Sequence, residues 1–190
     1  MKTSFVMIAS ALILAPRGLS AQQGAPRTGV EEIYILRSLR VSRIVPTDYC
    51  AERRTGFPAA TMEDRYDFKA VATNPASGEV TNPSGPTVGH LHACFGTTAD
   101  SLVVSFYTEG DVQGMPVIGR GQCRTTRREF PEAGISLLTC HLNLTGLPTG
   151  YVGGQLTTNT LASRTILGAG SDPPGYTQPS IATVRLWKKR

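Results

Sequence analysis

Hydrophobic and polar residues alternate along much of this chain with a period of two. The alternation is clearest over residues 138–144 (LTCHLNL), where the even-numbered positions are apolar and the odd-numbered ones polar. Successive side chains of a strand point to opposite faces, so the pattern predicts a strand with one buried face. Residues 181–188 alternate in the same way, and no stretch of a dozen residues has a convincing helical period. The pattern therefore predicts an all-β protein.

Eight stretches of this kind are separated by turn signals. Asn74-Pro75 and the DPPG of residues 172–175 are two of these turn signals. The stretches expected to form strands are 32–45, 62–73, 88–97, 101–108, 116–124, 135–144, 151–159 and 181–188. Short strands at this spacing are typical of a barrel or a β-sandwich. We expect a single antiparallel barrel of about eight strands, with a sandwich as the alternative.

The amino terminus has the order of features of a secretory signal. Lys2 is followed by an apolar run of ten residues, 5–14, and then by Pro16, Gly18 and small residues up to Ala21. The run is shorter than the roughly 20 residues that span a bilayer, so no membrane span is expected. The sequence thus divides into a signal peptide (1–21), a flexible arm (22–30) and a β-barrel domain (31–190). A secreted or periplasmic location follows.

Composition narrows the range of partners. The formal net charge of +5 includes Lys2 and Arg17 of the expected signal peptide. So small a charge does not favour a nucleic-acid partner. No cofactor is expected, and the oligomeric state is left open.

Cys50, Cys94, Cys123 and Cys140 all follow the expected signal peptide. An even number of cysteines in an exported chain favours disulfides. Positions 123 and 140 lie symmetrically about a turn at residues 131–134, so in a hairpin they would face each other. This pairing leaves Cys50 with Cys94. Zinc binding is the competing interpretation, but the sequence has no C-x-x-C motif.

Two glycine-containing stretches carry a family resemblance. Residues 147–157 (LPTGYVGGQLT) resemble a pattern in allene oxide cyclase and dirigent-type barrels, in which a glycine, an aromatic residue and small residues open a late strand. Residues 119–122 (GRGQ) are similar to the strand before it. The four cysteines and the long loop before Ser180 depart from that pattern. The resemblance implies an eight-stranded barrel with a cavity for small apolar or phenolic molecules, and it transfers no catalytic residue.

Asp64 is the main candidate for acid–base chemistry. It is in phase with Met62, Tyr66 and Phe68, so its side chain is expected to point inward. Desolvation favours the protonated form of a buried carboxyl group, which makes Asp64 a candidate general acid or base with Tyr66 as its hydroxyl partner. The alternatives are a turn cap or a pair with an arginine at the barrel rim. Tyr66, Phe68 and Phe106 are the expected ligand-binding residues.

The motif HLHAC at residues 90–94 is the sharpest candidate metal site. On a strand His90, His92 and Cys94 share one face, and His141 could add an imidazole from a neighbouring strand. However, residues 91, 93 and 95 form an apolar face, so alternation directs the histidines to solvent, and a disulfide-bonded cysteine is no thiolate ligand. We therefore expect a surface histidine pair and no metal.

Two classes of function remain. The first is a secreted small β-barrel that binds or isomerises a small apolar molecule in its interior; whether it is a cyclase-type isomerase is left open. The alternative is a non-catalytic secreted interaction or structural protein with a filled core. A cavity of about 300 Å³ or more with Asp64 or a histidine would favour the first class. A solid core with an exposed apolar patch would favour the second.

Overall fold

The computed structural model describes residues 29–44, 48–56, 60–74, 76–77, 79–81, 85–96, 103–130, 135–163 and 178–190. The expected signal peptide, residues 1–21, lies outside this part, as do residues 22–28 of the expected arm. The first strand begins at Gly29, inside the range expected to be an arm.

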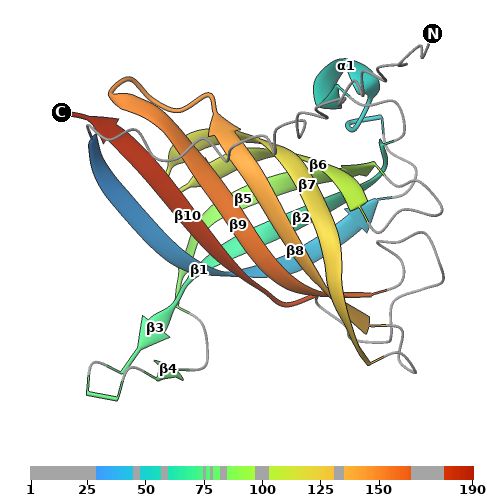
Figure 1. Ribbon diagram of the computed structural model, residues 1–190, viewed down its shortest axis with the longest axis horizontal. Coiled ribbons are helices and arrows are strands. Elements are labelled where there is room, and N and C mark those ends of the chain that lie inside the picture. Colours follow the sequence, from blue (N-terminus) through green and yellow to red (C-terminus); the bar gives the residue numbers. More distant parts are fainter. Residues whose placement is uncertain are drawn as a thin grey trace, which may run out of the picture.

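Eight antiparallel strands close into one barrel (Figure 1), as the alternation predicts. Each strand pairs with its neighbours in the chain, and the last barrel strand returns to the first, so the barrel is of the up-and-down type. Because the sheet is closed, the prediction of a barrel is confirmed and the alternative of a β-sandwich is not. The strands are β1 (Gly29–Ile44), β2 (Ala60–Ala70), β5 (Thr87–Gly96), β6 (Val103–Val112), β7 (Met115–Phe130), β8 (Ile135–Thr145), β9 (Tyr151–Ser163) and β10 (Ser180–Lys189).

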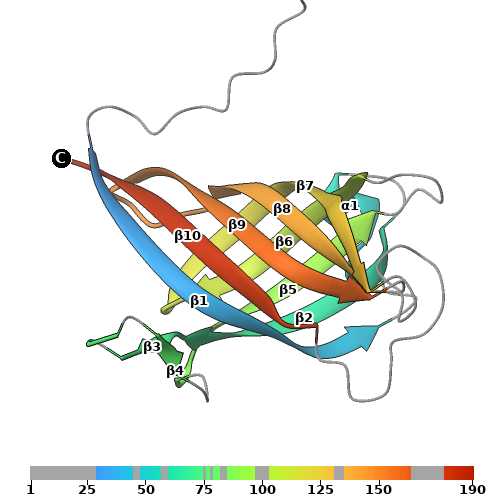
Figure 2. The same ribbon diagram turned by 60° about the horizontal axis from the view of Figure 1, so that its bottom comes forward.

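Three short elements were not predicted. The strands β3 (Ala72–Thr73) and β4 (Val80–Thr81) form a hairpin that projects from the barrel in Figures 1 and 2. The predicted strand 62–73 therefore ends early, at Ala70, whose backbone bonds with Gly85 and Pro86. A single helical turn, α1 (Glu52–Thr55), lies between β1 and β2. In the described part of the chain, no helix has the length and apolar character needed to cross a membrane.

Strand β7 is longer than predicted and runs to Phe130 instead of stopping at residue 124. Its last part holds the charged stretch 124–129, which has no apolar alternation. The pairing with β8 shifts register twice there, between Thr125 and Arg127 and between Arg127 and Phe130. These irregularities interrupt the period of two, which explains why the sequence pattern missed the extension.

Inward-pointing side chains fill most of the barrel. Alternate residues of each strand are buried, as in β8, where positions 136, 138, 140, 142 and 144 are all buried. Gly119 on β7 is part of this packing, because a Cβ there would lie 2.8 Å from Thr108 Cγ2 and 3.1 Å from Leu142 Cδ2. The main apolar contributors are Leu36, Phe68, Leu91, Val104, Leu142, Leu156, Val184 and Leu186.

Two disulfides have the predicted pairing. Cys123 and Cys140 are register partners on β7 and β8, with Cα atoms 3.9 Å apart, and both side chains belong to the barrel core. Cys50 and Cys94 join the segment 48–56 to the outer side of β5, with Cα atoms 5.6 Å apart. Disulfides of this kind are typical of oxidising compartments such as the periplasm or the cell exterior.

We expect both disulfides to stabilise the fold by restricting the unfolded chain. Cys123 and Cys140 are 17 residues apart in the sequence, and Cys50 and Cys94 are 44 residues apart. Loop-closure entropy then predicts that double alanine variants lose about 3 and about 4 kcal/mol of unfolding free energy, respectively. Urea titrations would measure both losses. An unchanged unfolding free energy in either variant would contradict this account.

Candidate functional site

A cavity lies inside the barrel near the end where β1 finishes and β10 begins. One side of it is aromatic and includes Tyr66, Phe68, Phe95 and Phe106. The rings of Phe95 and Phe106 stack with centroids 4.7 Å apart and planes at 11°. The structure thus brings the three residues expected to bind ligand, Tyr66, Phe68 and Phe106, around one space.

The wall formed by β1, β10 and β9 carries hydroxyl groups, and Ser38 of this wall is the register partner of Phe68 on the aromatic side. Ser38 on β1, Ser180 on β10 and Thr160 on β9 are successive register partners, so they form a row across three strands. Thr160 Oγ1 donates a hydrogen bond to Ser180 Oγ at 2.9 Å, and Thr158 also lines the space. The sequence reasoning missed this row. Alternation could have predicted part of it, because Thr158 and Thr160 lie on the same face of the strand as the apolar Leu156.

The cavity is small. It offers about 20 Å³ to the centres of water-sized molecules. About 10–15 Å³ is needed to hold one water, so the enclosed part has room for little more than that. Including space that is open to solvent, the atom-free volume among its lining side chains is about 380 Å³.

A buried ion pair contacts Tyr66 and Gln178 of the cavity lining and does not itself line the cavity. Asp64 is 0 % exposed, and Arg43 donates to both its carboxylate oxygens, from Nε at 2.6 Å and from Nη2 at 2.7 Å. The Tyr66 hydroxyl donates to Asp64 Oδ2 at 3.0 Å. The expected inward direction of Asp64 is therefore observed, together with the arginine pairing that was its alternative interpretation.

A β-bulge places Arg43 on the inner face. The register between β1 and β2 shifts between Arg40 and Ser42, so that Arg40 is opposite Tyr66 and Arg43 is opposite Asp64. Without the extra residue, Val41, side-chain alternation would direct Arg43 outward. Bulges commonly re-aim a side chain in this way. Val41 itself points to solvent and is 58 % exposed.

Gln178, which precedes β10, joins this ion pair to Tyr66 and Arg40. Its Nε2 donates to the Tyr66 hydroxyl at 2.7 Å. Its Oε1 accepts from Arg40 Nη1 at 2.7 Å and from Arg43 Nη2 at 3.1 Å. It is 1 % exposed and has a φ of 50°, an uncommon conformation for a residue with a side chain. Gln178 precedes the last strand and lies outside any alternating stretch, so no sequence pattern pointed to it.

Burial raises the pKa of the Tyr66 hydroxyl well above its usual value of 10.0, and the negative charge of Asp64 adds to this effect. Tyr66 is therefore neutral at physiological pH. Its hydroxyl both donates to Asp64 and accepts from Gln178, which fixes its orientation. The arrangement can present a protonated, oriented hydroxyl at the wall of an apolar space. A catalytic role for Asp64 and Tyr66 stays a prediction.

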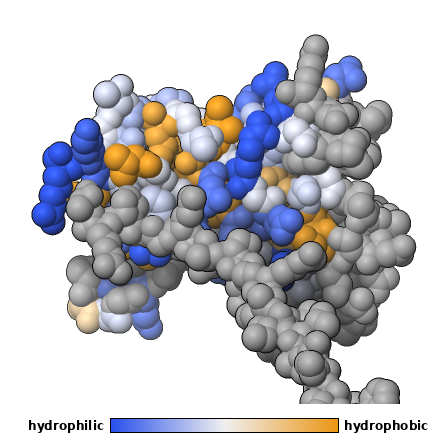
Figure 3. All heavy atoms as spheres, turned by 45° about the horizontal axis from the view of Figure 1, so that its top comes forward, coloured by the Kyte–Doolittle hydropathy of each residue, from blue (hydrophilic) through white to orange (hydrophobic). Residues whose placement is uncertain are grey.

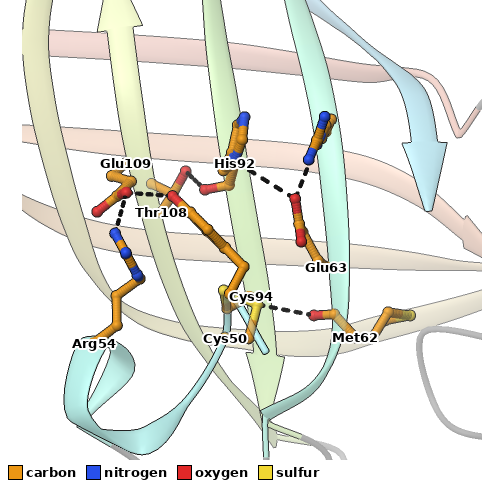
Figure 4. A network of polar contacts seen from close by, with 10 residues as sticks. Cys50, Arg54, Met62, Glu63, His92, Cys94, Thr108 and Glu109 are labelled. Atoms are coloured by element: carbon orange, nitrogen blue, oxygen red, sulfur yellow. Dashed lines mark hydrogen bonds and ion pairs between the residues drawn. A yellow bond between two sulfur atoms is a disulfide. The ribbon is translucent and has the colours of Figure 1, made fainter. Parts of the chain in front are cut away.

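The two histidines of the HLHAC motif lie on the outer face of β5, and Figure 4 shows His92 on the same strand as Cys94. His92 Nδ1 is 3.5 Å from Glu63 Oε1, and its ring centroid is 4.8 Å from that of Tyr49. His90 Nδ1 lies 2.9 Å from Asp67 Oδ1. Cys94 is in a disulfide and is no thiolate ligand.

His141 does not join this pair. It lies on β8, and β6 and β7 separate that strand from β5, so the expectation of a neighbouring strand was wrong. The error arose because the alternation does not show that the barrel is of the up-and-down type, in which the two predicted strands between 88–97 and 135–144 also lie between them in space. Within the described residues, no group of three or more histidine, cysteine, aspartate or glutamate side chains could hold a metal ion.

Glu109 is the centre of a polar cluster on the outer face of the barrel. We call Tyr49, Arg54, Tyr107 and Glu109 the outer cluster, and Figure 4 labels Arg54 and Glu109. Glu109 accepts hydrogen bonds from the hydroxyls of Tyr49 and Tyr107 and from Arg54 Nη1, the last at 2.6 Å. The guanidinium of Arg54 also lies 4.4 Å from the centroid of Tyr49. Together with the Cys50–Cys94 disulfide, these contacts hold the segment 48–56 against the barrel wall.

The outer surface is mixed in polarity. On the face shown in Figure 3, hydrophobic residues form small groups between hydrophilic ones. Within the described residues, β1 has the most large hydrophobic side chains that are exposed. These are Val30, Ile33, Ile35, Val41 and Ile44, with Val152 on β9 and Ile181 on β10.

The fold and its interior define a closed up-and-down β-barrel with a small cavity that is aromatic on one side and hydroxylated on the other. Comparison of the chain with protein-family models, with curated proteins and with solved structures gives no match.

We expect the Arg43–Asp64 pair to be strongly coupled. Replacing Asp64 with alanine leaves a largely buried guanidinium uncompensated, which predicts a loss of about 3–5 kcal/mol in unfolding free energy. The double variant Arg43→Met/Asp64→Leu should recover most of that loss, since it removes both charges. Arg54→Ala, in a partly exposed pair, should cost about 1 kcal/mol or less. Equal losses in Asp64→Ala and the double variant, measured by urea titration, would refute the coupling.

Stability should fall at alkaline pH. Burial and the hydrogen bond to Glu109 raise the pKa of Tyr107 from 10.0 to about 12. Between pH 10 and about 12 the unfolded chain therefore releases this proton while the folded protein keeps it, so the unfolding free energy decreases as pH rises. The Tyr107→Phe variant cannot ionise there and should lose less stability across this window. Urea titrations at a series of pH values test this, and parallel curves for the two proteins would contradict it.

Proposed function

We propose that this protein binds a small, mainly apolar molecule inside its barrel. The observation that carries the proposal is the two-sided lining of the cavity, with stacked phenylalanines facing a row of hydroxyls. A side chain that only fills a core is best apolar, because a buried hydroxyl costs free energy unless it is hydrogen-bonded. Hydroxyl groups around a space are instead typical of ligand sites, where a few polar groups set orientation.

The lining indicates how a ligand would lie. Its ring or alkyl part would pack against Phe68, Phe95 and Phe106, and its polar atom would face Tyr66 or the hydroxyl row. The enclosed volume holds little more than one water, so even a compact organic ligand would require lining side chains to move.

The resemblance of residues 147–157 to allene oxide cyclase and dirigent-type barrels belongs to the same proposal. In such a barrel, the Tyr66 hydroxyl would orient the substrate by accepting a hydrogen bond from it, because its own proton is donated to Asp64 and its raised pKa makes it a weak acid. Asp64 would hold that hydroxyl in place, since its carboxylate already accepts bonds from Arg43 and Tyr66. Export through a signal peptide at residues 1–21 is also part of the proposal and agrees with the two disulfides.

A second candidate is a non-catalytic secreted protein whose barrel is a filled scaffold. The observation in its favour is the enclosed volume of about 20 Å³, which is far below that of typical ligand pockets. Exposed isoleucines on β1 also agree with a role that uses the outer surface.

Ligand binding can separate the two candidates. We expect p-cresol and toluene to raise the melting temperature, with p-cresol the tighter ligand. Tyr66→Phe should weaken p-cresol binding by about fivefold, the worth of one hydrogen bond of about 1 kcal/mol, and leave toluene binding nearly unchanged. Calorimetry or ligand-observed NMR would measure both affinities.

Tyr107→Phe is the matched control, because it removes a hydroxyl from the outer cluster and not from the cavity. It should leave both affinities unchanged. Thr158→Leu, which fills the cavity, should abolish binding of both molecules. The filled-scaffold candidate would hold instead if neither molecule shifted the melting temperature and Thr158→Leu stabilised the protein.

A further inference from the structure

The outer face of β1 carries a contiguous apolar strip. Ile33 and Ile35 are 56 % and 57 % exposed, although they belong to a regular strand of a closed barrel. On the adjacent β10, Ile181 is 44 % exposed and lies diagonally next to Ile35. Single exposed apolar residues are ordinary, but neighbouring ones on a sheet face mark interaction sites. In Figure 2, β1 and β10 lie side by side across the barrel.

Charges of opposite sign flank this strip on β1. The outward residues in order are Glu31, Ile33, Ile35 and Arg37, so the pattern is negative, apolar, apolar, positive. The row is about 20 Å long at the usual rise of a strand. A second copy of this row in the opposite direction places positive opposite negative and apolar opposite apolar.

A second copy could therefore pack on the strip through a two-fold axis. If two β1 strands face each other in opposite directions around Tyr34, Ile33 of one copy meets Ile35 of the other. Glu31 then meets Arg37, and this contact occurs twice, as a two-fold interface requires. Glu31 already bonds Arg185 Nε at 2.7 Å within its own chain, so the second arginine would extend an existing charge pair.

The adjacent strand matches under the same operation. Register places Trp187 beside Glu31 and Ile181 beside Arg37. An axis that runs across the strands brings β10 of one copy over β10 of the other, so Ile181 would meet Trp187. The Trp187 ring lies next to Gly153 of β9, since a Cβ at Gly153 would be 3.3 Å from Trp187 Cε3. One operation thus pairs the charged residues of β1 and the apolar residues of both strands, and on β10 it places Arg185 over Thr183.

From this self-complementarity we propose that the β1–β10 face is the interface of a homodimer. The partner of this surface is a second copy of the same chain, with antiparallel β1 strands at the centre and the Glu31–Arg37 pairs at the two ends. The cavity and its lining take no part in the contact, so the proposal is independent of ligand binding.

Sedimentation equilibrium of the purified protein tests the interface. The unaltered protein should have the mass of two chains, and Ile35→Asp should raise the dissociation constant by at least about tenfold, because a carboxylate would be buried in the apolar contact. Val41→Asp is the matched control. Val41 lies on the same strand and is 58 % exposed, but it is beyond the proposed contact, so this variant should remain a dimer.

Charge reversal tests the orientation. Glu31→Arg and Arg37→Glu should each weaken the dimer, and the double variant Glu31→Arg/Arg37→Glu should restore it, because the reversed charges pair again across the axis. Circular dichroism would verify that all variants fold. The proposal is overturned by a monomer at every concentration, by a mass of three or more chains, by dissociation of Val41→Asp, or by failure of the double variant to recover.

Discussion

Closure of the sheet is the constraint on which the rest of this structure depends. Pairing of β1 with both β2 and β10 leaves the barrel without a free edge, and it fixes which alternate residues lie inside. Every inner position must then fit a limited volume. The inward Gly119 and the Cys123–Cys140 bridge within the core are consequences, since neighbouring side chains already occupy the space around them. The outer positions are not limited by the volume inside the barrel, and they carry histidines, acidic residues and isoleucines.

Within that frame, the buried carboxylate of Asp64 requires compensation. A single inserted residue at Val41 supplies it by turning Arg43 inward, and Tyr66 and Gln178 complete the hydrogen bonds. The network crosses from β2 to the residue preceding β10, so it also sets the position of the Tyr66 hydroxyl at the cavity wall. An ion pair inside a barrel is a costly way to gain stability. Its effect on the orientation of Tyr66 is therefore the better reason for its presence.

Alternation was sufficient to predict the eight strands, the barrel and the inward direction of Asp64, because one buried face produces a period of two. Symmetry about a turn predicted Cys123–Cys140, since antiparallel neighbours are equidistant from their connection. Gln178 and Arg43 could not be predicted. The first precedes its strand, and the second depends on a bulge, which breaks the period used to assign faces. The distance of His141 from β5 depends on the order of strands around the barrel and not on any local pattern.

The interior and the exterior of the barrel together bear on its role. The hydroxyl groups of Ser38, Thr158, Thr160 and Ser180 around the cavity support the proposed ligand, and two of them, Thr160 and Ser180, also satisfy each other by a hydrogen bond. The small enclosed volume requires the lining to move even when a compact molecule binds. The isoleucine strip lies on the outer face of β1, whereas Leu36 and Ser38 of the same strand lie on its inner face. Because alternation separates the two faces, a contact between two copies on the outer face leaves the inner face of β1 available to a ligand.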